Sequence, residues 1–170
     1  ELGRLDVVVA NAGVSSWGRF WEMSDEQWQT MIDINLKGSW IVARRVIPHM
    51  IQQKSGVILN NSSVMGLRGG RRLSHYVASK WGLVGLTKSW ALELAPHNIR
   101  VISLHPTGVN TPMNDGLAFL EGKTTQEIAE ASAGNLQPVP WIEPEDVANA
   151  VRQWRDALDA DLDRDELSKF

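Results

Sequence analysis

The 170-residue chain contains no cysteine, which excludes disulfide frameworks, thiolate zinc sites and cysteine nucleophiles. It also lacks any apolar run near the ~18 residues that a membrane-spanning helix needs. No basic segment followed by an apolar stretch resembles a secretory signal, so we expect a cytoplasmic protein without a membrane partner. The formal net charge of −3 argues against a protein that binds nucleic acid by electrostatic attraction.

Ligand-like histidine spacing is missing as well. The chain has four histidines, but they are not spaced as metal ligands and have no cysteine partners, so we expect no bound metal. Tyrosine occurs once, at residue 76. The hydrophobic content of 43% is close to that of globular proteins and excludes a disordered chain.

Short apolar runs alternate with segments of helical periodicity along the chain. The runs at 5–10, 56–61 and 99–104 are rich in β-branched residues and predict buried strands. Strands that alternate with helices predict an α/β fold with a parallel, Rossmann-like doubly wound sheet and right-handed crossovers. Three strands are few for such a sheet, so we expect an incomplete one.

Helices are expected where apolar residues recur at helical spacing. Ser24 and Gln27 have the form of a capping box and predict a helix that runs to about Ile47, with weak points near Gly38 and Pro48. Pro144 suits the first position of a late helix. The remaining expected helices cover residues 74–94, 125–133 and about 145–154.

The acidic residues are concentrated at the C-terminal end. Residues 143–170 carry nine acidic and four basic side chains, a balance of −5, so residues 1–142 sum to +2. No strand pattern follows residue 154. We interpret residues 151–170 as an acidic tail that is either solvated or a frayed helix.

Tyr76 and Lys80 stand four residues apart in the helix expected over 74–94, so their side chains share one face. A nearby cation favours the phenolate of a tyrosine, and such a hydroxyl could take a proton from an alcohol or give one to a carbonyl. Ser63 ends the second expected strand, at the edge where open α/β sheets bind ligands. Taken singly, these residues are more often an ordinary surface neighbour pair and a serine that leaves a strand.

Two further positions are of interest. Asn11-Ala12-Gly13 ends the first expected strand, where glycine either lets a flat ligand approach the backbone or simply permits a turn. Asn35 lies inside an expected helix, where asparagine is mildly unfavourable. It is either tolerated there or bonds backbone or water at a local break.

Taken together and in this order, these residues resemble the short-chain dehydrogenase/reductase family over residues 1–150. The segments that carry the resemblance are Ala10–Gly13, Asn35, Ser63, Tyr76–Lys80 and His105–Thr111. Residues 1–6 and 105–113 are further similar to the carveol-dehydrogenase-like branch, which includes mycofactocin-coupled oxidoreductases.

The resemblance implies an oxidoreductase that interconverts a secondary alcohol and a ketone by hydride transfer, with NAD as cofactor and NADP not excluded. Tyr76 would be the acid and base, and Ser63 would position the substrate oxygen. Lys80 would lower the pKa of the tyrosine and hold the nicotinamide ribose, and Asn35 would anchor a water for proton relay. The implied cofactor contacts are Asn11, Ala12, Gly13, Tyr76, Lys80, Pro106, Thr107, Gly108, Val109 and Thr111.

The resemblance also shows what the family has and this sequence lacks. No Thr-Gly-x-x-x-Gly-x-Gly turn, which receives the cofactor pyrophosphate at a helix N-terminus, is present, nor the strand that selects NAD or NADP. We therefore interpret residues 1–150 as the catalytic part of one N-terminally truncated domain that holds the fourth to sixth family strands. Its first residue, Glu1 rather than Met, agrees with this interpretation, and residues 151–170 are a divergent tail.

This interpretation leaves two functional alternatives. The chain as given is expected to bind NAD weakly or not at all and to turn over little or nothing, either as part of an oxidoreductase or as an inactive remnant that serves as a packing or dimerisation module. The intact protein is expected to be a homo-oligomer, a dimer or tetramer, through the helices that carry Asn35 and Tyr76. An apolar pocket for a bulky, terpene-like substrate is expected at Trp17, Trp21, Met113 and Leu117.

Overall fold

A computed structural model describes residues 3–133 and 141–159. Its strands β1 (Val7–Ala10), β2 (Gly56–Asn61) and β3 (Ile99–Leu104) form a parallel sheet in the order β1-β2-β3. In the register of the sheet, Val8 pairs with Ile58, which pairs with Val101. The predicted parallel, Rossmann-like α/β fold is confirmed, and the described part of the sheet has the three strands that were expected.

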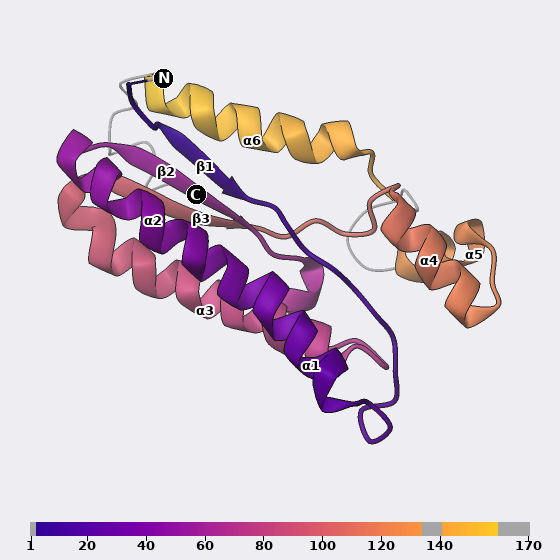
Figure 1. Cartoon of the computed structure of the whole chain (residues 1–170). Coiled ribbons are helices and arrows are strands. Elements are labelled where there is room, and N and C mark those ends of the chain that lie inside the picture. The colour runs from indigo at the N-terminus through magenta and orange to yellow at the C-terminus, as the bar shows by residue number, and fades with distance from the viewer. Residues whose placement is uncertain (1–2, 134–140, 160–170) are drawn as a thin grey trace.

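Helices cover both faces of this sheet (Figure 1). The helices α2 (Gly38–Gln53) and α3 (Ser74–Leu94) lie on one face, and α6 (Pro144–Asp159) lies on the other. Strand β2 is buried almost throughout because it has a neighbouring strand on each side and helices on both faces. This arrangement explains why its sequence is a continuous apolar run rather than an alternating one.

The long helix expected from residue 24 consists of three segments. Ser24 caps α1 (Asp25–Ile32) through a complete capping box with Gln27, as predicted. A π-helical turn, Asp33–Lys37, follows, and α2 begins at Gly38. Gly38 therefore marks a real junction, whereas Pro48 lies inside α2 and does not end it.

The main hydrophobic core lies between the sheet and the helices α2 and α3. Met50 of α2 and Ile58 of β2 are almost completely buried there, together with Trp90 of α3 and Val101 of β3. Full burial of side chains of this size stabilises the fold by about 1.5–3 kcal/mol each. This core holds the carboxyl ends of the strands in place relative to α3.

The segment after β3 differs from the prediction in one respect. Helix α5 (Thr125–Ala133) was expected, but α4 (Pro112–Glu121) was not, since a proline, an asparagine and a glycine within six residues suggest a loop. Pro112 is instead the first residue of α4, where its missing N–H costs nothing. Helix α6 extends to Asp159, so residues 151–159 of the predicted tail are helical, and residues 160–170 lie outside the described residues.

None of the helices within residues 3–133 and 141–159 is both long and apolar enough to cross a bilayer. No three histidine or acidic side chains among these residues stand close enough together to hold a metal ion.

Candidate active site

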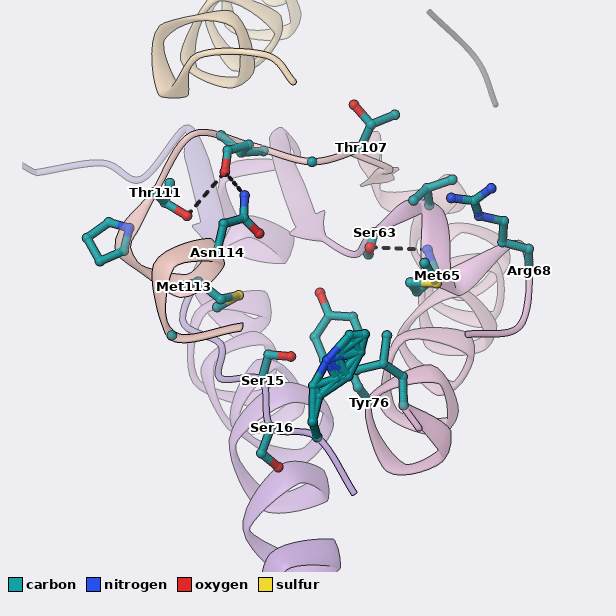
Figure 2. A pocket seen from close by; sticks show the side chains of 17 residues that line it. Ser15, Ser16, Ser63, Met65, Arg68, Tyr76, Thr107, Thr111, Met113 and Asn114 are labelled. Carbon is teal, nitrogen blue, oxygen red and sulfur yellow. Dashed lines mark hydrogen bonds between the residues drawn. The ribbon is translucent and has the colours of Figure 1, made fainter. Parts of the chain in front are cut away.

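The predicted chemical residues meet where the strands end. Two cavities open at this edge of the molecule, and Tyr76 and Ser63 line both of them. The first cavity, of about 440 Å³, is drawn in Figure 2 and lies between the loop after β1, the start of α3 and the segment after β3. The second, of about 420 Å³, lies over the ends of β1 and β2. Thr107, Thr111 and Met113 also border both cavities.

Tyr76 lies in the first turn of α3, and Figure 2 shows its hydroxyl directed toward Ser63. Burial of the ring raises the pKa of Tyr76, and hydrogen bonding with the Ser63 side chain acts in the opposite direction. The sequence led us to expect that Lys80 lowers this pKa. In the chain alone the net direction is upward, because desolvation of the phenolate outweighs the other effects.

Lys80 lies one turn further along α3 and is only 5% exposed. Its Nζ donates to the carbonyl of Asn61 at 2.8 Å and lies 5.6 Å from the centroid of the Tyr76 ring. Desolvation lowers the pKa of Lys80 to about 8. A lysine ammonium has three hydrogens, so Nζ keeps donors for a ligand in the second cavity, which it also lines.

Asn35 lies in the π-helical turn and is buried behind both cavities rather than lining either. Its Oδ1 accepts from the amide of Val14 at 2.8 Å, and its Nδ2 donates to the carbonyl of Val14 at 2.9 Å. Nδ2 also contacts Ser79 Oγ of α3 at 3.2 Å. The Asn35 side chain thereby joins three segments: its own π-helical turn, the loop after β1 and helix α3.

Ser63 lies two residues after the end of β2 and caps a short 3-10 turn, Val64–Gly66, whose Met65 amide donates to Ser63 Oγ at 3.1 Å. The serine carbonyl lies 3.0 Å from Nδ1 of His105, and Nε2 of the same ring lies 2.8 Å from Ser103 Oγ. A carbonyl only accepts, so Nδ1 carries a hydrogen and donates to the Ser63 carbonyl. The sequence had marked His105 only as part of a motif, and it proves to support Ser63.

His75 is a residue of the site that sequence reasoning missed. It is 1% exposed, and its Nε2 lies 2.7 Å from Oγ of Ser16, which lines the first cavity. Burial lowers the pKa of His75 and therefore favours the neutral ring. Only its position beside Tyr76 could have drawn attention to it, because the partner serine is distant in sequence.

The second cavity contains most of the predicted cofactor contacts. Its lining includes the whole turn after β1 and both members of the Tyr–Lys pair. Gly108 and Val109 line only the first cavity. The predicted contacts found in the second cavity are Asn11, Ala12, Gly13, Tyr76, Lys80, Pro106, Thr107 and Thr111.

The expected apolar pocket is confirmed at two of its four positions. Trp17 and Met113 line the first cavity. Trp21 does not: it is 67% exposed and borders a separate surface hollow with Phe20, because the loop turns outward at this point. The side chain of Leu117 lies outside the part of the chain that the structure describes.

This arrangement defines the chain as part of a Rossmann-type α/β domain. The family model "short chain dehydrogenase" matches residues 1–118, and the chain belongs to that family. It is 48% identical over 160 residues to (-)-trans-carveol dehydrogenase of Rhodococcus erythropolis, covering 88% of this chain and 58% of that protein. The predicted family and the resemblance to its carveol-dehydrogenase-like members are confirmed.

Solved structures agree with this assignment. The structure of carveol dehydrogenase from Mycobacterium avium in complex with NAD is 37% identical, with a TM-score of 0.80, and the match covers 88% of this chain and 58% of that one. ElxO with NADP bound is 28% identical, with a TM-score of 0.78, over 89% of this chain and 60% of that one. The chain thus spans somewhat more than half of the length of these relatives.

The second cavity fits the nicotinamide ribose half of such a cofactor. A Cβ added to Gly13 would stand 3.3 Å from Asn35 Oδ1 and 3.7 Å from Lys80 Nζ, so glycine keeps the floor of the cavity open. The remaining hydrogens on Lys80 Nζ are donors suited to a ribose diol. Chemically, these groups match a flat ring joined to a sugar.

Proposed function

We propose that the protein is an NAD-dependent oxidoreductase that interconverts a secondary alcohol and a ketone, with Tyr76 as the acid and base. The observation that carries this proposal is that Tyr76 and Ser63 border both cavities. A substrate oxygen in the first cavity can therefore reach the tyrosine while a cofactor occupies the second. An inactive packing module would not account for two cavities that meet at these residues.

Each residue of the site has a definite task in this proposal. In the oxidation direction, the phenolate of Tyr76 takes the proton of the alcohol. Ser63 meanwhile holds the alcohol oxygen by a hydrogen bond. A nicotinamide cofactor, when bound, supplies or accepts the hydride. Lys80 holds the ribose and, when protonated, favours the phenolate.

Asn35 acts at a distance from the reacting atoms. Its bonds to Val14 hold the loop after β1 in place. This loop forms the floor of the second cavity and part of the wall of the first. We keep the anchoring of a relay water by Asn35 as a proposal.

The substrate belongs in the first cavity, which has a largely apolar wall that includes Trp17, Val64, Met65 and Met113. A cavity of this kind suits a compact hydrocarbon skeleton such as an alicyclic alcohol or ketone. The relatives named as carveol dehydrogenases support this class, and the NAD-bound structure supports NAD over NADP. Coupling to mycofactocin stays a prediction.

Replacement of the hydroxyl of Tyr76 tests the proposal. The purified chain is given NAD at millimolar concentration, to offset the weak binding expected of it, with a panel of alicyclic secondary alcohols, and NADH is followed by its absorbance. Tyr76→Phe should reduce kcat by about 100-fold or more, in line with the usual contribution of a general acid or base, and leave NAD binding nearly unchanged by calorimetry. Lack of turnover by an unaltered chain that calorimetry shows to be saturated with NAD overturns the function, and near-normal turnover in Tyr76→Phe overturns the assigned base.

We also propose that the protein forms a homo-oligomer, a dimer or tetramer, through α2 and α3. Large apolar side chains are exposed on these helices, among them Trp40 on α2 and Trp81 and Leu92 on α3. Such exposure is unusual unless another surface covers it. Light scattering should show a mass above that of one chain, and Leu92→Glu should lower it. An unaltered chain that is monomeric at high concentration contradicts the proposal.

A further inference from the structure

Arg68 is the only charged side chain among the described residues that line the first cavity. Its Nε is buried and has no hydrogen-bond partner. The described ion pairs do not involve this residue, and the described lining of the cavity includes no acidic side chain. Arg68 therefore brings a guanidinium to the substrate cavity without a protein carboxylate to pair with it.

An unpaired donor of this kind is costly. A buried N–H without an acceptor loses about 1–3 kcal/mol of hydrogen bonding, and a charged group loses more. The loop at 66–72 also carries Arg71 and Arg72, but these two line a separate surface hollow and not this cavity. A ligand with a negatively charged acceptor would satisfy the unpaired donor of Arg68. The planar guanidinium matches the two oxygens of a carboxylate.

The position of Arg68 is set relative to Tyr76. The carbonyl of Arg68 accepts from Trp81 Nε1 of α3 at 3.5 Å, and the preceding amide, that of Leu67, donates to the carbonyl of Val64 at 3.0 Å. Both the loop and the tyrosine are thus anchored to the same helix. In Figure 2, Arg68 lies on the side of the cavity opposite to Met113, beyond Met65.

A second residue that lines the same cavity also carries an unpaired donor. The indole Nε1 of Trp17 is buried and has no partner. Trp17 lies in the loop after β1 and Arg68 in the loop after β2, so the two donors come from different segments of the chain. Arg68 Nε and Trp17 Nε1 both lack a hydrogen-bond acceptor, and an entirely hydrocarbon skeleton would not supply one.

We propose that the substrate carries a carboxylate in addition to its reacting oxygen, and that Arg68 binds this carboxylate. This inference rests on the proposed function. Tyr76 and Ser63 hold the alcohol or ketone oxygen, and Val64 and Met65 contact the carbon skeleton that separates it from the carboxylate. Arg68 determines which alcohols are accepted and takes no part in proton or hydride transfer.

The binding arm of the test uses cyclohexanecarboxylate and its uncharged counterpart cyclohexanecarboxamide, measured by calorimetry at one ionic strength. The unaltered chain should bind the carboxylate about tenfold or more tightly than the carboxamide, since a charge-assisted, bidentate pair is stronger than a neutral hydrogen bond. Arg68→Gln should bring this ratio to about one. Arg71→Gln, in the same loop but outside the cavity lining, should keep the ratio of the unaltered chain.

The turnover arm separates failure of this inference from failure of the proposed function. It compares oxidation of 4-hydroxycyclohexanecarboxylate with that of 4-hydroxycyclohexanecarboxamide in the presence of NAD. Oxidation of both with equal kcat/KM overturns the carboxylate site and leaves the oxidoreductase proposal intact. Binding of the carboxylate through Arg68 without oxidation of either alcohol upholds the site and overturns the oxidoreductase. Equal affinity for the two binding probes, or no binding of the carboxylate, also overturns the inference.

Discussion

Asn35 bonds both backbone groups of Val14: its Oδ1 accepts from the Val14 amide at 2.8 Å and its Nδ2 donates to the Val14 carbonyl at 2.9 Å. The two residues lie 21 positions apart, in a helical segment and in the loop after β1. The buried Asn35 side chain therefore satisfies both backbone groups of Val14, as a neighbouring strand would. The loop in turn supplies the floor of the cofactor cavity and part of the wall of the substrate cavity.

Truncation of this amide should destabilise the fold. Asn35→Ala leaves the amide and carbonyl of Val14 without protein partners, and each unpaired group of this kind costs about 1–3 kcal/mol. Because Val14 is only half-buried and water can reach it in part, we expect a loss of about 2–4 kcal/mol in unfolding free energy, measured by urea denaturation. Asn149→Ala, at an exposed position of α6, should change it by less than about 0.5 kcal/mol. A similarly small change in Asn35→Ala would contradict the structural role.

The ionisation of Lys80 should make stability depend on pH. Its pKa is lowered from 10.5 to about 8 in the folded chain, so between these values the unfolded chain binds more protons than the folded one. The Lys80 contribution to unfolding free energy should therefore rise as pH increases from 8 toward 10.5, by about 3 kcal/mol in total. Below pH 8 both forms are protonated, and the cost of burying the charge is present in full.

Comparison with Lys80→Met isolates this contribution. The difference in unfolding free energy between the two chains, followed by denaturation from pH 7 to 10, should shift in favour of the unaltered chain as pH rises. Tyr76 acts in the opposite sense at higher pH, because its raised pKa makes the folded chain keep a proton that the unfolded chain loses. Lys88→Met, exposed on the same helix, should show no such shift. A pH-independent difference for Lys80→Met would be evidence against the buried charge.

Gly66 is required by the packing between the 3-10 turn after β2 and helix α3. A Cβ at this position would stand 2.6 Å from Ser62 Oγ and 3.1 Å from the carbonyl of Lys80, two groups that share a hydrogen bond of 3.1 Å. Gly66→Ala should lower the unfolding free energy by about 1–3 kcal/mol through overpacking. Gly69→Ala, where a Cβ meets nothing within 4 Å, should be neutral or slightly stabilising. Equal midpoints of thermal unfolding for the two variants would rule out the crowding.

Features that depend on neighbouring residues in the sequence were mostly predicted correctly, whereas several features that depend on residues far apart in the sequence were not. Strands β2 and β3 and helix α3 have the predicted bounds, because apolar period and terminal residues are local signals. The break of the expected long helix at 33–37 was not predicted as a π-helical turn. The bonds that accompany it join Asn35 to Val14 and Ser79, which are distant in sequence.

The same distinction applies to the site. The sequence by itself determined that Tyr76 and Lys80 share one face of a helix and that Ser63 closely follows a strand that ends at Asn61, because helical spacing and strand length are local properties. Their proposed roles came from the resemblance to a family. Only the tertiary structure decided that burial moves the pKa of Tyr76 upward and that of Lys80 to about 8. It also decided that Arg68 and Trp17 reach the same cavity as Tyr76, since burial and convergence depend on segments far apart in the chain.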